Sequence, residues 1–260
     1  MGLSSYTKNM KRVSSFFFVG LFLLPIVFLI ILSAAENWRY PTLLPEVWTG
    51  QHWRDFFGGH NHLYEHLLLS LMLSCSVAAV VTIFGFFISK KVLQHVQSDF
   101  LLKMAYIPYS FSPVMYAFCV HFLFLRLGLG GTLLGVWVAQ FLLTFPFVIL
   151  LFSSHWTKQL FEMEQLVATL GGSSQDAFWK VLFPMSKNML LLAFFQTFLI
   201  SWFDYGLVAV IGLGKIQTMT ILTYQFVGEA NLYFAAIASL LTLIPPLILL
   251  WFNRNLLFRK

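Results

Sequence analysis

The feature that most constrains this chain is a series of long apolar stretches that carry almost no charge. A helix needs about 20 apolar residues to cross the hydrocarbon core of a bilayer, and only helices or closed barrels satisfy their own backbone hydrogen bonds there. None of the stretches alternates apolar and polar residues as a barrel strand does. They therefore predict six membrane-spanning helices, at residues 15–35, 67–89, 100–125, 132–153, 185–203 and 233–252.

The composition agrees with a lipid-embedded fold. Hydrophobic residues make up 59% of the 260 residues and charged residues only 10%, whereas a soluble domain has about 25% charged residues. So few charges could not cover a water-facing surface. The net charge of +6 comes from basic residues dispersed along the chain, so no nucleic-acid partner is expected. We expect an all-α membrane protein in a lipid bilayer.

The N-terminal segment allows two readings. Lys8, Lys11 and Arg12 precede an apolar stretch that ends in Ser33-Ala34-Ala35, a pattern typical of a signal peptide with its cleavage site. The stretch is longer than the 7–15 residues of a signal-peptide core, which favours a retained helix. The predicted domains are residues 1–64, with this helix and an outer loop, and residues 65–260, a five-helix core that carries a loop at 154–184.

The basic residues predict the orientation. Six spans place both termini on one side of the membrane, and 12 of the 16 Lys and Arg residues lie on that side. By the positive-inside rule this side is cytoplasmic. The protein is therefore expected in a bacterial inner membrane with both termini in the cytoplasm. The exceptions, on the outer side, are Arg39, Arg54, Arg126 and Lys215.

The sequence lacks the marks of a metal site, a disulfide or an enzyme. Cys75 and Cys119 lie inside apolar stretches, and there is no CxxC pair. The outer-loop histidines have no acidic or thiol partner at a metal-binding spacing; they are His52, His60, His62 and His66. Neither HExxH nor GxSxG occurs. No catalytic residue, metal or cofactor is predicted.

The connection at residues 154–184 has the pattern of two short helices rather than a linker. Residues 160–170 place five apolar side chains on one helical face, namely Leu160, Met163, Leu166, Val167 and Leu170. Gly171-Gly172 predicts the end of this helix. Ser173 and Asp176 predict a capping box that starts a second helix at residues 175–182, which leads to Pro184. Such a rigid protrusion is suited to docking with a cytosolic partner.

This loop resembles the EAA loop of permease subunits of binding-protein-dependent ABC importers. The resemblance lies in the run from Glu164 to Gly171 and in Pro184, 13 residues after that glycine. It departs from the usual motif because Gln165 stands where the family has glutamate, and Leu166 and Val167 replace the two alanines. The Ala-Thr-Leu-Gly end and the glycine-to-proline spacing agree better.

Other stretches extend the resemblance over residues 65–250. These are Ile107-Pro108 to Pro113-Val114, Gly131 to Val148, and Gln217 to Thr220 with Tyr224. The resemblance implies the type I importer permease fold and residues that couple the permease to its ATPase. The coupling residues that match are Glu164, Gln165, Ala168, Gly171, Gly172 and Pro184.

The same resemblance implies partners. Two permease subunits, from this chain or a paralogue, would form one pathway, and two cytosolic ATPase subunits would drive it. A periplasmic binding protein would deliver substrate. The chain has no GxxxxGK(S/T) phosphate-binding loop, so the ATPase would be another chain. The resemblance leaves open a polyamine, ferric iron, thiamine, sulfate or phosphonate as substrate.

Few ionisable residues lie within the predicted spans, where they are candidates for function. Asp204 follows Ser201-Trp202-Phe203, and Gln196 lies two turns earlier on nearly the same face. Gln196, Trp202 and Asp204 are therefore candidates for the translocation pathway, although Asp204 could instead cap or pair near the interface. The alternative function is an ion-gradient-driven secondary transporter, which would be expected to show inverted repeats with buried charges. Neither is seen.

Overall fold

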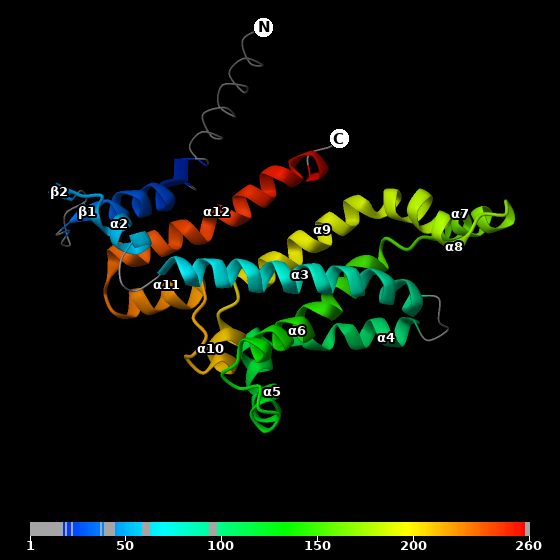
Figure 1. Ribbon diagram of the computed structural model, residues 1–260, viewed down its shortest axis with the longest axis horizontal. Coiled ribbons are helices and arrows are strands. Elements are labelled where there is room, and N and C mark those ends of the chain that lie inside the picture. The colour runs from blue at the N-terminus through cyan, green and yellow to red at the C-terminus, as the bar shows by residue number, and fades with distance from the viewer. Residues whose placement is uncertain are drawn as a thin grey trace, which may run out of the picture. The chain divides into compact units, whose positions relative to one another are not determined.

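A computed structural model describes residues 18, 20, 21, 23–36, 38, 45–58, 63–93 and 98–257 (Figure 1). Within these ranges the chain is almost entirely helical. A short antiparallel pair of strands, β1 (Ala35–Glu36) and β2 (Val47–Trp48), sets Ala35 opposite Trp48. His60 and His62, two of the outer-loop histidines, lie outside the described residues.

Four predicted spans are confirmed as helices long and apolar enough to cross a membrane. They are α3 (Leu63–Leu93), α6 (Leu133–Ser153), a helix that ends in α9 (Phe183–Trp202), and α12 (Leu232–Leu257). Only 28–39% of their most apolar windows is buried inside the protein. The rest is an apolar surface that lipid can cover without loss of hydrogen bonds.

The third predicted span, residues 100–125, is not one straight helix. The chain bends by 99° between residues 110 and 113, so this part consists of α4 (Ser98–Ala105), η1 (Ile107–Ser110) and α5 (Pro113–Arg126). Proline has no backbone N–H and disfavours helix at the residue before it. Pro113 accordingly starts a new helix, with Ser112 as its N-cap accepting from Met115 N.

Among the described residues, four helices are long and apolar enough to span a membrane, or five if the bent pair crosses as one. Part of the first predicted span lies outside the described residues, and its described helix, Leu23–Ser33, is shorter than a crossing requires. The prediction of six spans is not established by the described part of the chain.

The connection between the last two spans contains two helices that the sequence did not predict, α10 (Gly206–Gly212) and α11 (Met219–Gly228). Leu207 and Ile211 of α10 are fully buried, and α10 packs against α5 and α6. Seven apolar residues are too few to predict a span, so the sequence gives no sign of this helix.

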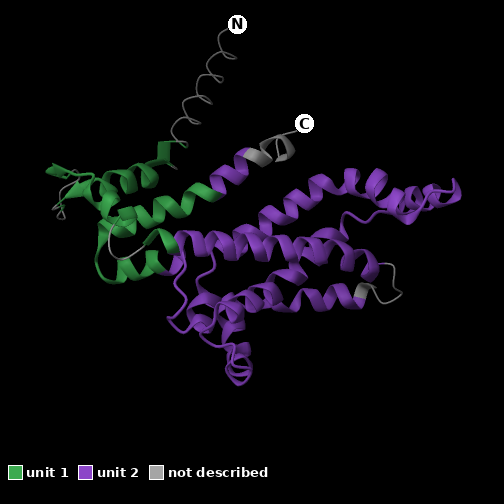
Figure 2. Ribbon diagram, viewed as in Figure 1, with its two compact units in different colours: residues 1–65, 222–245 green, residues 66–221, 246–260 purple. Residues whose placement is uncertain are grey.

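The chain divides into two compact units (Figure 2). Unit 1 comprises residues 1–65 and 222–245, and unit 2 comprises residues 66–221 and 246–260. In unit 1, α2 (Gln51–Gly58) stacks His52 on Tyr233 with ring centroids 4.7 Å apart. The hydroxyl of Tyr233 accepts from the backbone N–H of Trp38 at 2.9 Å. The predicted domains, 1–64 and 65–260, stay a prediction.

The core of unit 2 joins α3, α6 and α10. Val81 of α3, Val136 of α6 and Leu207 of α10 are fully buried in one cluster. At Gly85, α3 packs closely against α6, since a Cβ there would lie 2.5 Å from Val148 Cγ1. Small residues allow such close helix packing in membranes. The core thereby fixes α3 and α6, from which the candidate site extends.

Candidate functional site

The 154–184 loop forms a pair of short helices in unit 2, α7 (Lys158–Thr169) and α8 (Ser174–Ala177) with η2 (Phe178–Leu182). We call them the loop helix pair. α7 packs against both α8 and η2, and the pair extends from the N-terminal end of α9 (Figure 1). The predicted helix–turn–helix is confirmed in outline.

The turn between the helices is a Schellman motif, in which the last carbonyls of a helix accept from N–H groups beyond it. Gly171 N–H donates to Ala168 O at 3.1 Å, and Gly172 N–H donates to Val167 O at 2.9 Å. Gly171 has φ of +80°, a left-handed conformation that glycine adopts without steric cost. The predicted glycine stop is confirmed.

The predicted capping box is confirmed as well. Ser173 Oγ accepts from Asp176 N at 3.1 Å, and Asp176 Oδ2 accepts from Ser173 N at 3.1 Å. Asp176 also pairs with Lys180 at 2.6 Å, one helical turn later. Two backbone N–H groups at the helix start are thus bonded, which makes the beginning of α8 well defined.

The second helix does not end before the span, and in this respect the prediction of a helix at 175–182 was wrong. One helix runs from Ser174 to Trp202, through the π-helical turn η2. Phe183 N–H donates to Phe178 O, five residues back. Pro184 explains the π turn, because its ring lacks an N–H and would clash with the carbonyl four residues earlier in an α-helix.

The apolar stripe of α7 is partly buried and partly exposed. Leu160 is buried and Val167 is half-buried, whereas Met163, Leu166 and Leu170 are 43%, 57% and 79% exposed. The five apolar side chains lie on one helical face, as predicted, but only one edge of that face is buried. The outer face, defined by Met163, Leu166 and Leu170, is an exposed apolar patch beside the turn, and such patches mark interaction sites.

The predicted coupling residues occupy different environments. Gln165, Ala168 and Gly171 are exposed on the loop helix pair, and Gly172 is half-buried. Glu164 is half-buried, and its carboxylate accepts a hydrogen bond from Lys90 Nζ at the end of α3. Pro184 is exposed in the first turn of α9.

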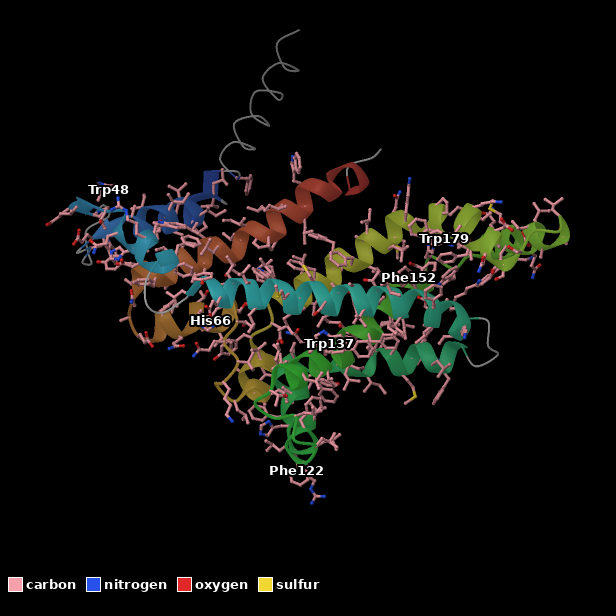
Figure 3. The ribbon with its side chains drawn as sticks, in the orientation of Figure 1. Trp48, His66, Phe122, Trp137, Phe152 and Trp179 are labelled. Atoms are coloured by element: carbon pink, nitrogen blue, oxygen red, sulfur yellow. The ribbon has the colours of Figure 1, made fainter. Side chains whose placement is uncertain are left out.

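A pocket of ≈ 520 Å³ opens beside this ion pair, between the end of α3 and the loop helix pair. Trp179, whose position Figure 3 labels, forms part of its aromatic wall together with Phe87 and Phe178. The remaining lining residues are Lys90, Lys91, Glu164, Ser174, Gln175 and Leu182.

An aromatic cluster that the sequence did not predict holds the start of α7. Trp156, in the turn before α7, donates from Nε1 to Ser89 Oγ at 2.8 Å. Its ring lies 4.9 Å from that of Phe86 and 5.9 Å from that of Phe161, measured between centroids. The only sequence signal was the density of aromatic residues, which apolar helices show throughout.

The predicted pathway residues do not form one group. Asp204 is 9% exposed; its Oδ2 accepts from Gln140 Nε2 at 3.1 Å, and its Oδ1 accepts from Leu207 N at 3.2 Å at the start of α10. Gln196 is half-buried and makes neither of these bonds. Trp202 is 2% exposed and stacks on Phe198.

Gln140 completes a buried network that the sequence did not predict. Ser201 Oγ donates to Gln140 Oε1 at 2.7 Å and lies 3.1 Å from Ser74 Oγ. The network therefore joins α3, α6 and α9 and, through Asp204, fixes α10. A lone glutamine in an apolar stretch was its only sequence signal, and buried polar groups in membranes are normally hydrogen-bonded across helices.

No family model matches the chain. Among curated proteins, it is 20% identical over 230 residues to the inner membrane ABC transporter permease protein YcjP of Escherichia coli, covering 84% of this chain and 82% of that protein. It is 27% identical over 191 residues to the sulfate transport system permease protein CysW of Synechococcus elongatus, covering 66% of this chain and 65% of that protein. It is 25% identical over 202 residues to sulfate permease 2, chloroplastic, of Chlamydomonas reinhardtii, covering 71% of this chain and 55% of that protein.

These relatives are permeases rather than enzymes. The alignments span less than two thirds of the length of the two sulfate permeases. The similarity to ABC transporter permeases agrees with the apolar helices of this chain.

Proposed function

We propose that this chain is the permease subunit of an ATP-binding-cassette importer. The observation that carries the proposal is the outer face of α7, where Leu166 and Leu170 are 57% and 79% exposed beside a rigid turn. An apolar patch on a structured protrusion is suited to a protein partner. The similarity to ABC transporter permeases supports an ATPase subunit as that partner.

The division of labour follows from this assignment. The membrane helices and those of a second permease subunit enclose the substrate pathway, and a periplasmic binding protein delivers substrate to it. Closure of two ATPase subunits on ATP moves the loop helix pair and so changes access to the pathway. Gln165, Ala168 and Gly171 are the exposed contact residues, while Gly172 and Pro184 shape the turn and the start of α9.

The orientation is part of the proposal. Lys90 and Lys91 end α3 beside the loop helix pair, which itself carries Lys158 and Lys180. By the positive-inside rule this side faces the cytoplasm, where an ATPase is found. Both chain termini would lie on the same side, in a bacterial inner membrane.

Sulfate is the substrate to test first, since two relatives are named as sulfate permeases. A free carboxylate in the pathway would favour a cationic substrate such as a polyamine or ferric iron. Both oxygens of Asp204, however, accept hydrogen bonds from within the protein, so Asp204 gives little support to a cation. Thiamine and phosphonates are tested alongside.

The test is co-purification with a defined ATPase. The tagged chain is co-expressed with the ABC ATPase and the binding protein encoded by its neighbouring genes. We expect the ATPase to co-purify in detergent, and the binding protein to bind sulfate by calorimetry. A stable, folded chain that retains no ATPase would contradict the permease assignment, whereas a binding protein that prefers another ligand would change only the substrate.

A further inference from the structure

The inner face of α7 is attached to the end of α3 by a charged pair. Lys90 and Glu164 are separated by 74 residues in sequence, and their side chains are only 20% and 26% exposed. Charges at this depth interact more strongly than surface pairs, because water screens them less. The other carboxylate of α7, Glu162, is 60% exposed and pairs with Lys158 on its own helix.

A second attachment lies next to the first. The ring of Trp156 lies 6.0 Å from Lys90 Nζ, and its Nε1 donates to Ser89 Oγ. Phe86, one turn earlier on α3, contacts the same ring. The last turns of α3 therefore hold both the turn before α7 and the middle of α7.

We propose that Lys90 and Glu164 form a latch that makes α3 move with α7. In this assignment Glu164 does not contact the ATPase; it is a positioning residue that fixes the orientation of α7. The proposal rests on the proposed function, since α7 is the helix that the ATPase would move. The latch adds a second route by which the movement of α7 reaches the membrane. This route is α3, beside the continuous helix from Ser174 to Trp202.

The geometry supports a device of this kind. Glu164 and Lys90 line the ≈ 520 Å³ pocket, so their side chains have space to separate when α7 moves. Leu160 and Val167 lie on the same side of α7 as Glu164, at the i and i+7 spacings of one helical face. The outer face with Leu166 and Leu170 stays available to the partner while the inner face is held.

A charge-reversal cycle tests the latch. Lys90→Glu and Glu164→Lys each place like charges together, whereas the double variant restores an opposite pair with its order reversed. In the complex with the ATPase, we expect each single variant to lose severalfold of the stimulation of ATP hydrolysis by the binding protein. The double variant should recover most of it. If Glu164 contacted the ATPase instead, the double variant would remain as defective as Glu164→Lys, which would overturn the proposal.

Glu162→Lys is the matched control, on the same helix but outside the latch. It should keep the stimulation, and Lys90→Glu should not be rescued by it. A rescue equal to that by Glu164→Lys would show a general effect of charge rather than a pair, and would also overturn the proposal.

A structural measurement separates failure of the latch from failure of the proposed function. Spin labels are placed at Ile88 on α3 and Thr169 on α7, in a background in which the exposed Cys75 and Cys119 are serine. In nanodiscs the unsubstituted pair should give a narrow distance distribution that broadens in either single reversal and narrows in the double variant. This measurement needs no ATPase, so it tests the latch even if the proposed partner is wrong. Unchanged distributions in both single variants would contradict the latch.

Discussion

At the scale of single residues, the hydrogen bonds of Asp204 can be tested by substitution. Asp204 accepts from Gln140 and from the backbone of Leu207. Asp204→Ala would remove one acceptor of the buried Gln140 amide and the acceptor of the Leu207 backbone N–H, which costs about 1–3 kcal/mol. We expect a lower melting temperature for the purified protein in detergent, measured by tryptophan fluorescence.

Asp204→Asn is the informative companion. An asparagine oxygen can still cap α10, so this variant should be closer to the unsubstituted protein in stability. If Asp204→Asn were fully stable yet inactive in transport, the carboxylate charge itself would be required, and the pathway role predicted from sequence would be favoured.

At the scale of elements, the turn of the loop helix pair can be altered without touching the spans. Gly171 has φ of +80°, which costs about 1–2 kcal/mol for most other residues. Gly171→Val should distort the turn and weaken retention of the ATPase, while the chain still inserts in the membrane. Gly171→Asn is the control, because asparagine tolerates this conformation. Equal retention by Gly171→Val and the unsubstituted chain would count against the role of the turn.

The outer face of α7 makes a separate prediction. Leu166→Asp with Leu170→Asp places two charges in the proposed interface, and burying an unpaired charge is costly. We expect loss of ATPase co-purification with no change in melting temperature, since both side chains are exposed. Gln159→Asp, an exposed position in the first turn of α7, should leave the complex intact.

The close packing of α3 against α6 at Gly85 predicts the effect of a substitution there. A Cβ at position 85 would lie 2.5 Å from Val148 Cγ1, whereas one at Gly228 would meet nothing within 4 Å. Gly85→Ala should therefore lower the free energy of unfolding by about 1–3 kcal/mol. Gly228→Ala should be close to neutral. Similar melting temperatures for the two variants would contradict the close contact.

Some elements of this fold could be predicted from the sequence and others could not. Length and hydropathy predicted α3, α6, α9 and α12, because a straight crossing requires a long apolar run. They could not predict the 99° bend between α4 and α5, since prolines can either kink a helix or end it. The pairing of Glu164 with Lys90 could not be predicted either, because the two residues are 74 positions apart and meet only through the packing of α3 and α7.

At the scale of the whole molecule, the charge pattern predicts which side each loop faces. Lys158 and Lys215 are both exposed, and the positive-inside reading places them on opposite sides. In the background without native cysteines, Lys215→Cys should react with a membrane-impermeant maleimide in intact cells. Lys158→Cys should react only after the membrane is opened. Labelling of Lys158→Cys in intact cells would reverse the proposed orientation.

The position of α10 has a consequence for how the protein is made. A helix of seven residues, Gly206–Gly212, is too short for the insertion machinery to recognise as a crossing. Its buried side chains contact α5 and α6, which are synthesised earlier. α10 can therefore take its place only once α5 and α6 have been synthesised. A nascent chain halted before residue 206 would leave part of the α5 and α6 surfaces uncovered, as a substrate for membrane quality control.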